Sequence, residues 1–166
     1  MGRTLLGIWT WFAFAAVSSV GYCICLVIFL ATVAFDPNRR ITGRAIRIVG
    51  ICMVRAVPAW RFEYLPPVPS QLPERLVCVS NHCSNLDPFL VAHLPWEMKY
   101  LAKDVLFKIP AVGWGIRIAG DIPLVRGSTQ SIKAAMSRAA RYVRNGMPVL
   151  IFAEGTRSKT GELLPF

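Results

Sequence analysis

An uncharged run covering residues 4–35 places the strongest constraint on how this chain can fold. One passage across the hydrocarbon core of a bilayer needs about 20 apolar residues, whereas the apolar region of a cleaved signal peptide has only about 7–15. Two complete spans would need about 40 residues, so a transmembrane hairpin does not fit. The run therefore predicts either one long tilted span or a helix that kinks at Gly21 and dips into one leaflet.

Composition also points to a membrane. The sequence has 166 residues, 54% of them hydrophobic and 17% charged, with a formal net charge of +10. A disordered chain would be poorer in apolar residues, a nucleic-acid module less apolar, and a small disulfide-stabilised domain richer in cysteine. A soluble domain of this length has little interior in which to bury the whole run as a core helix. We therefore expect a lipid bilayer as partner and no nucleic acid.

A basic amphipathic helix is predicted over residues 39–57. At 100° per residue, four arginines fall within an arc of about 80°, with apolar residues opposite. They are Arg40, Arg44, Arg47 and Arg55. This pattern is typical of a helix in the headgroup layer, although a helix packed on its own domain gives it too. The positive-inside rule places this side of the run in the cytoplasm, at the inner cell membrane.

Prolines indicate where the anchor ends. Pro58, Pro66, Pro67, Pro69 and Pro73 predict an extended connector. It separates a membrane-anchoring helical region, residues 1–64, from a second domain, residues 65–166. The second domain is also basic, which predicts an anionic ligand. The five cysteines have no zinc-site spacing and are expected to be reduced thiols, so we expect no metal site.

The second domain is predicted to be α/β. Short apolar runs predict buried strands at residues 75–80, 98–102, 122–125 and 148–153. Between the last two, helical spacing predicts a helix that Ser128 caps and Gly146 ends. Strands alternating with helices favour a largely buried sheet flanked by helices.

The segment that follows the first strand contains two residues that are candidates for acid–base chemistry. His82 and Asp87 are five residues apart, which on a regular helix would turn them about 140° away from each other. In a turn between a strand and a helix, Asp87 could reach a ring nitrogen of His82, making His82 a general base. Asp87 followed by Pro88 also fits a helix N-cap and first helical position. The competing interpretation is that Asp87 only caps a helix and His82 is a turn residue.

Basic residues follow two other strands, where α/β sheets bind ligands. Arg126 comes after the third strand. Glu154, Gly155, Thr156 and Arg157 come after the fourth. Each arginine is a candidate phosphate ligand, with surface charge or a polar turn as the alternative. Together these features predict a base and two phosphate ligands at three strand ends.

These motifs resemble the PlsC-like glycerolipid acyltransferases. Asn81, His82 and Asp87 match the NHxxxxD block, and GDIPLVRG matches the second block at Gly120, Ile122 and Arg126. AEGTRS matches the third, the EGTRS block, and Lys103 with the residues after it also fits. The resemblance covers about residues 75–166. The most similar type is the 1-acyl-glycerol-3-phosphate acyltransferases.

The resemblance implies acyl transfer from a CoA or acyl carrier protein thioester to the sn-2 hydroxyl of lysophosphatidic acid, without cofactor or metal. His82 would deprotonate the hydroxyl and Asp87 would orient His82. Arg126, Arg157 and Lys103 would hold the phosphate, while Glu154 orients the loop of Gly155, Thr156 and Arg157 or helps to bind the acceptor. The family has a fourth block further along, so we expect the domain to be incomplete at Phe166.

Several alternatives stay open on sequence grounds. The acceptor could be another lysophospholipid or a lyso-aminolipid. Cys83 or Ser84 could act as a covalent nucleophile. Cys83 adjoins the candidate base His82, however, and neighbouring side chains on an extended chain point apart. A hydrolase could use the same residues. A non-catalytic lipid-binding protein of the same fold would have no use for the base.

Overall fold

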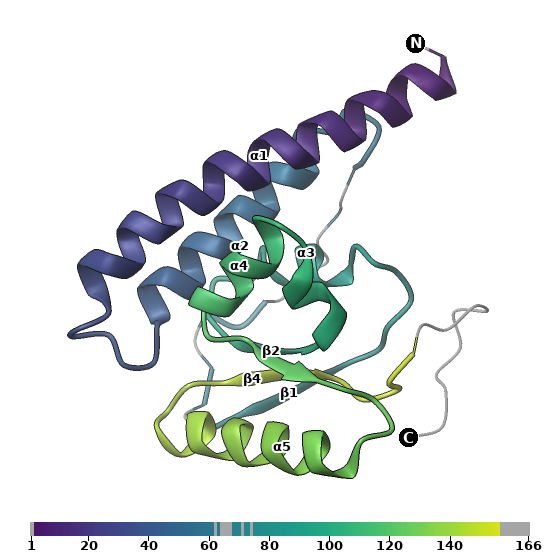
Figure 1. The fold of residues 1–166 in the computed structure, drawn as a ribbon. Coiled ribbons are helices and arrows are strands. Elements are labelled where there is room, and N and C mark those ends of the chain that lie inside the picture. Colours follow the sequence, from purple (N-terminus) through teal and green to yellow (C-terminus); the bar gives the residue numbers. More distant parts are fainter. Residues whose placement is uncertain (1, 62, 64–67, 71, 74, 157–166) are drawn as a thin grey trace.

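The computed structural model describes residues 2–61, 63, 68–70, 72–73 and 75–156. Its helices lie above and below one sheet (Figure 1). The predicted boundary between residues 64 and 65 lies outside the described residues, as do Pro66, Pro67 and Arg157. The elements, in chain order, are α1 (Arg3–Thr32), α2 (Arg40–Arg55), β1 (Val77–Ser80), α3 (Asp87–Val91), β2 (Lys99–Lys103), the 3-10 helix η1 (Asp104–Lys108), α4 (Val112–Ile118), β3 (Ile122–Leu124), α5 (Thr129–Arg144) and β4 (Val149–Phe152).

The four strands form one parallel sheet in the order β1-β4-β2-β3, which confirms the predicted α/β class. The last strand in the chain therefore lies between the first and the second. Ser80 lies opposite Phe152, so the segments that follow β1 and β4 leave the same edge of the sheet side by side. In an open parallel sheet, this carboxyl edge is where ligands bind.

Each face of the sheet has its own apolar core. On one face, Ala135, Ala139 and Tyr142 of α5 pack against Ile122 and Val149. The Ser128 hydroxyl caps α5 by accepting a hydrogen bond from the Ser131 N–H, as predicted. On the other face, Met98, Tyr100 and Leu150 form a second core, over which α2, α3 and α4 lie (Figure 1).

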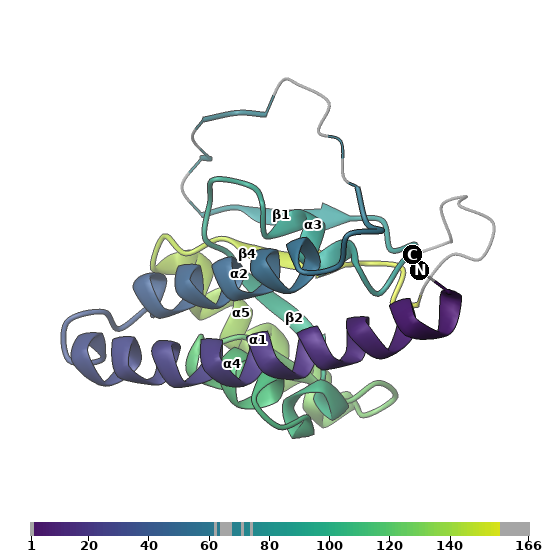
Figure 2. The same ribbon diagram turned by 90° about the horizontal axis from the view of Figure 1, so that it is seen from above.

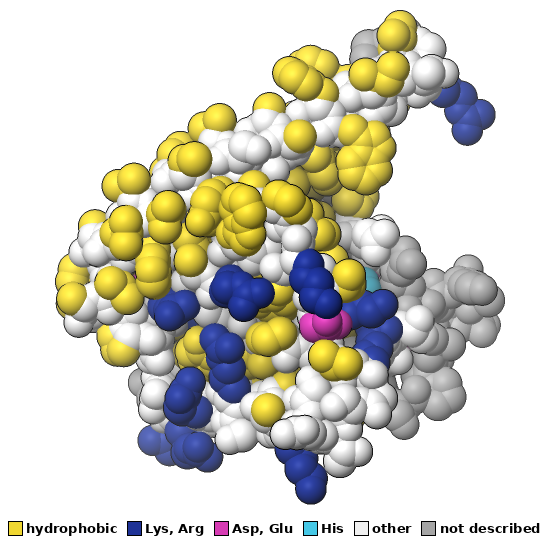
Figure 3. Space-filling model, viewed as in Figure 1, with side chains coloured by type: hydrophobic (Ala, Val, Ile, Leu, Met, Phe, Trp, Pro, Cys, Tyr) yellow, Lys and Arg dark blue, Asp and Glu magenta, His cyan; other side chains and the backbone are white. Residues whose placement is uncertain are grey.

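Helix α1 is continuous through Gly21, so the predicted kink is wrong. The glycine serves close packing instead, because a Cβ atom at Gly21 would lie 2.5 Å from Cγ1 of Val49 in α2. The two helices run side by side in both views (Figures 1 and 2). By length and composition α1 could cross a membrane. Its outer face is apolar and exposed, as Figure 3 shows, and carries Leu5, Ile8, Trp11, Phe12, Val20, Ile24, Val27 and Leu30.

Two arginines of α2, Arg44 and Arg47, face the sheet and its loops, and not a lipid surface. Arg47 is 4% exposed and donates both to the Asp121 carboxylate and to the Met98 carbonyl. Arg44 donates to the carbonyls of Ala92 and Leu94. These two arginines fit the competing interpretation, a helix packed on its own domain, whereas Arg40 and Arg55 are exposed and contact of the helix with headgroups stays a prediction. Both interpretations predict the same periodicity, so spacing could not separate them.

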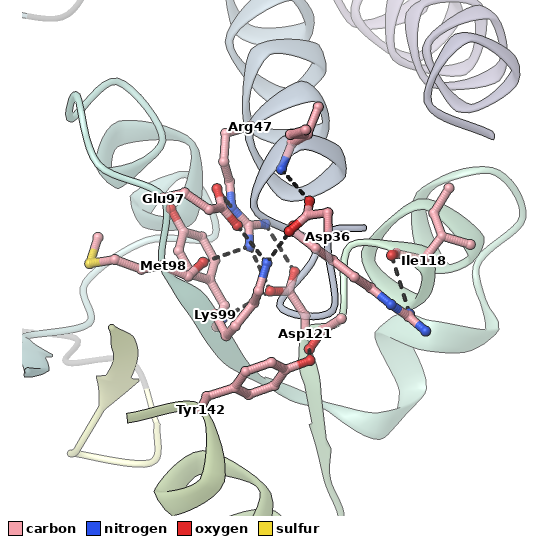
Figure 4. A network of polar contacts seen from close by, with 12 residues as sticks. Asp36, Arg47, Glu97, Met98, Lys99, Ile118, Asp121 and Tyr142 are labelled. Carbon is pink, nitrogen blue, oxygen red and sulfur yellow. Dashed lines mark hydrogen bonds and ion pairs between the residues drawn. The ribbon is translucent and has the colours of Figure 1, made fainter. Parts of the chain in front are cut away.

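A buried ionic network joins α2 to the sheet (Figure 4). The Lys99 ammonium binds Oε1 of Glu97 at 3.0 Å and the Arg39 carbonyl at 2.9 Å, while Arg47 lies 3.6 Å from the other Glu97 oxygen. Loss of hydration raises the pKa of Glu97 and lowers the pKa of Lys99. Burial acts to lower the pKa of Arg47 as well, but Asp121 and Glu97 outweigh it and raise that pKa.

Candidate active site

His82 and Asp87 meet in the turn between β1 and α3. Nδ1 of His82 lies 2.8 Å from Oδ2 of Asp87, and their side chains are 16% and 15% exposed. An ionised carboxylate only accepts hydrogen bonds, so Nδ1 carries the proton. Nε2 then keeps its lone pair and can accept a proton from a hydroxyl. Of the two sequence interpretations, the geometry thus favours an oriented histidine.

The Asp87 carboxylate also organises the turn that carries His82. Its Oδ2 accepts hydrogen bonds from the main-chain N–H groups of Cys83 and Ser84, each at 2.8 Å. The predicted N-cap is wrong, because α3 begins at Asp87 itself and has no side-chain cap. The carboxylate points back to the preceding turn, where three donors converge on one oxygen.

Glu154 fixes the main chain of His82. Its side chain is buried, and Oε1 accepts a hydrogen bond from the His82 N–H at 3.1 Å. The Phe152 ring, at the end of β4, lies 4.5 Å from the His82 ring. The sequence had suggested that Glu154 orients its own loop or binds the acceptor, and this contact with His82 was missed. It follows from the pairing of β1 with β4, and nothing in the sequence indicated that the two strands are neighbours.

The other candidates lie along the same carboxyl edge. Lys103 ends β2 opposite Leu124, the last residue of β3, and Arg126 lies two residues beyond that strand; both basic side chains are exposed. Neither side chain forms a hydrogen bond or ion pair with another described residue, and this includes His82 and Asp87. Gly155 has a φ of +62°, which glycine adopts without strain, and Thr156 is exposed. Arg157 lies outside the described residues.

Two residues of the second sequence block, GDIPLVRG at residues 120–127, have a structural role. The sequence alone did not distinguish that role from a role in catalysis or binding. Asp121 is 2% exposed and accepts a hydrogen bond from the Tyr100 N–H in addition to those from Arg47. Gly120 has a φ of +84°, and its carbonyl accepts a hydrogen bond from the Tyr142 hydroxyl. Asp121 and Gly120 therefore join β3 to α2 and α5, which leaves Arg126 as the exposed charged residue of the block. Within the described ranges, no three His, Cys, Asp or Glu side chains are grouped to hold a metal ion.

Comparison with known proteins identifies the group to which this fold belongs. The chain is 40% identical over 90 residues to a chloroplastic 1-acyl-sn-glycerol-3-phosphate acyltransferase of Brassica napus, covering 54% of this chain and 26% of that protein. It is 32% identical over 131 residues to a protein of that name from Chlamydomonas reinhardtii, covering 75% and 38%. The chain thus spans well under half of these relatives.

A solved structure and a family model agree with these relatives. The crystal structure of the 1-acyl-sn-glycerophosphate acyltransferase PlsC from Thermotoga maritima matches with a TM-score of 0.73 at 24% identity, over 98% of this chain and 64% of that one. That likeness shows a shared fold. The model of the family described as Acyltransferase matches residues 62–166. The chain belongs to the Acyltransferase family.

Proposed function

We propose that this protein transfers a fatty acyl group from a thioester to the sn-2 hydroxyl of 1-acyl-glycerol-3-phosphate, giving phosphatidic acid. The 2.8 Å contact between His82 and Asp87 at a strand end carries the proposal, because it leaves Nε2 of His82 free to act as a base. The names of the relatives support the choice of acceptor and reaction.

In the proposed mechanism, His82 Nε2 takes the proton of the acceptor hydroxyl as its oxygen attacks the thioester carbonyl. The carbonyl carbon gains a C–O bond, the tetrahedral intermediate collapses, and the C–S bond breaks. The thiolate of CoA or acyl carrier protein leaves and takes up the proton that His82 holds. Asp87 stabilises the imidazolium in between and prevents the ring from turning. No acyl-enzyme is formed.

We assign the phosphate of the acceptor to the free cations on the same edge. Lys103 and Arg126 are exposed and unpaired within the described residues, and a guanidinium binds phosphate through two parallel hydrogen bonds. Arg157 is proposed as a third phosphate ligand on the grounds of its sequence motif. Glu154 is proposed as a positioning residue, while Gly155 and Thr156 form the acceptor side of the loop.

Direct transfer is favoured over a covalent Cys83 intermediate. The only polar contact described for the Cys83 thiol is the Asn81 amide at 3.9 Å, and Nδ1 of His82 is committed to Asp87. A thiol nucleophile needs a base within hydrogen-bonding reach.

We further propose that residues 1–64 anchor the enzyme and residues 65–166 carry the acyltransferase machinery. The exposed apolar face of α1 would enter the bilayer, with the sheet on the cytoplasmic side of the inner membrane. The acceptor and the product are both lipids, so a site beside the membrane surface shortens their path.

The test is acyl transfer in membranes that contain the protein, with lysophosphatidic acid and either labelled acyl-CoA or labelled acyl carrier protein. We expect phosphatidic acid from the wild type and about 10²–10⁴-fold less from His82→Ala. Cys83→Ala is the matched control and should keep its activity. Equal product from wild type and His82→Ala would refute the base, and product from neither donor with a panel of acceptors would refute the activity.

A further inference from the structure

Two adjoining hollows lie on the edge of the sheet opposite His82. The larger, of about 800 Å³, lies where the chain enters β1 and β4 and is lined by Arg75 and Pro148, among others. The smaller, of about 560 Å³, lies along α2. Both are bordered by Arg40, Pro95 and Glu97, so the two hollows are continuous.

The larger hollow is cationic. Arg40, Arg75 and Arg144 line it from three separate parts of the chain. Arg40 is held in place by a hydrogen bond to the Gly146 carbonyl, whereas Arg75 and Arg144 are exposed and unpaired within the described residues. Three guanidinium groups around one hollow favour a phosphate, which they bind through charge-assisted hydrogen bonds.

Glu97 is the one acid among the described residues that line the hollow, and it does not cancel this charge. Its side chain is 7% exposed and is bound by Lys99 and Arg47 (Figure 4). Its negative charge is therefore compensated from inside the protein. The three arginines have no described acidic partner within the hollow.

The smaller hollow is apolar. Ile41, Ala45 and Ile48 line it at helical spacing along one side of α2. Ile41 and Ile48 are 46% and 50% exposed, which is high for isoleucine and leaves apolar area for a ligand to cover. Arg44 also lines this hollow, and its guanidinium donates to the Ala92 and Leu94 carbonyls.

We propose that the two hollows together bind one anionic phospholipid of the bilayer, with its phosphate among Arg40, Arg75 and Arg144 and an acyl chain along Ile41, Ala45 and Ile48. The charge of the larger hollow and the apolar lining of the smaller one match the two parts of such a lipid. The acyl chain of the lipid would extend along α2, which lies beside α1 (Figure 2). Because His82 lies at the other edge of the sheet, this lipid is a bound partner and not the acceptor.

The test measures lipid retained by the full-length protein in neutral detergent, read by native mass spectrometry. Phosphatidylglycerol is offered against phosphatidylcholine of the same chain length. The wild type should favour phosphatidylglycerol, and R75Q/R144Q should lose about tenfold or more of that preference, the order expected for two arginines near anionic lipid. K133Q/R141Q removes the same charge from the exposed side of α5 and should keep the wild-type preference.

Further arms identify the ligand and check the fold. I41S/I48S should retain less of either lipid, while glycerophosphoglycerol and inorganic phosphate should fail to displace phosphatidylglycerol. Matching melting temperatures among the variants would show that each is folded. An unchanged preference in R75Q/R144Q, an equal loss in K133Q/R141Q, or full displacement by free phosphate would each overturn the proposal. The readout is binding, so it is independent of the proposed acyl transfer.

Discussion

The guanidinium group of Arg47 binds both carboxylate oxygens of Asp121, at 2.9 and 2.6 Å, and so connects α2 to the start of β3. Both side chains are almost fully buried. A buried pair of this kind is costly to break from one side, because the remaining charge loses its partner but stays without water.

We therefore expect Arg47→Met to lower the free energy of unfolding by about 3–5 kcal/mol. Denaturant titration in mild detergent would measure it. Arg55→Met is the control, because Arg55 is exposed on the same helix and has no described partner. R47M/D121L should recover part of the loss, since neither charge is then left alone; a loss in Arg55→Met as large as that in Arg47→Met would contradict the assignment.

Gly21→Ala tests the contact between α1 and α2. The new Cβ would lie 2.5 Å from Cγ1 of Val49, so one side chain must move, and we expect a loss of about 1–3 kcal/mol. Gly7→Ala has nothing within 4 Å of the new atom and should be neutral or stabilising. Val49→Ala added to Gly21→Ala should restore stability, and a failure to do so would place the strain elsewhere.

Asp87→Asn should separate orientation from binding. The amide nitrogen donates hydrogen bonds, so it favours the His82 tautomer whose proton lies on Nε2, and the base is lost. We expect kcat to fall about 10²–10⁴-fold, with a much smaller change in the KM for lysophosphatidic acid. Ser84→Ala is the control in the same turn, and a comparable fall in kcat there would mean that the turn, and not the charge, matters.

Glu154→Gln and Glu154→Ala should differ. Glutamine keeps an oxygen that can accept the His82 N–H, whereas alanine leaves that N–H without its partner. We expect Glu154→Gln to retain most of kcat and Glu154→Ala to lose about tenfold or more, as misplacement of a catalytic group does. Steady-state kinetics would show it, and equal losses in both variants would favour a role for the charge itself.

Arg126→Gln tests the phosphate assignment. The loss of one charge-assisted contact should raise the KM for lysophosphatidic acid about tenfold, with a smaller effect on the KM for the thioester. Lys133→Gln removes one exposed positive charge from α5 and should leave both constants unchanged. A rise in both KM values for Arg126→Gln would indicate a general effect of the field around the site.

Local patterns predicted the individual elements well. The apolar runs placed all four strands to within about two residues, a normal error for such boundaries, and the Ser128 cap was found because its signal lies within a single turn. The His82–Asp87 contact was also predictable, since both residues belong to one short turn and depend on no distant segment.

What the sequence could not give was the relation between distant segments. The order of strands is set by how the whole sheet packs, so the sequence could not predict that Glu154 lies next to His82. The inward orientation of Arg47 in α2 was not predictable for the same reason, because its partners Asp121 and Glu97 lie far along the chain. An amphipathic pattern tells which face is basic, but not what that face contacts.

The place of β4 between β1 and β2 has a consequence for synthesis. A ribosome releases α1, α2, β1, β2 and β3 before β4, the strand that joins β1 to β2. Until β4 emerges, β1 has no neighbouring strand, whereas α1 can already contact lipid. His82 gains its Glu154 contact only when residue 154 emerges. In the proposed enzyme, the contact that positions the base would thus form only after α1 has had time to reach a membrane.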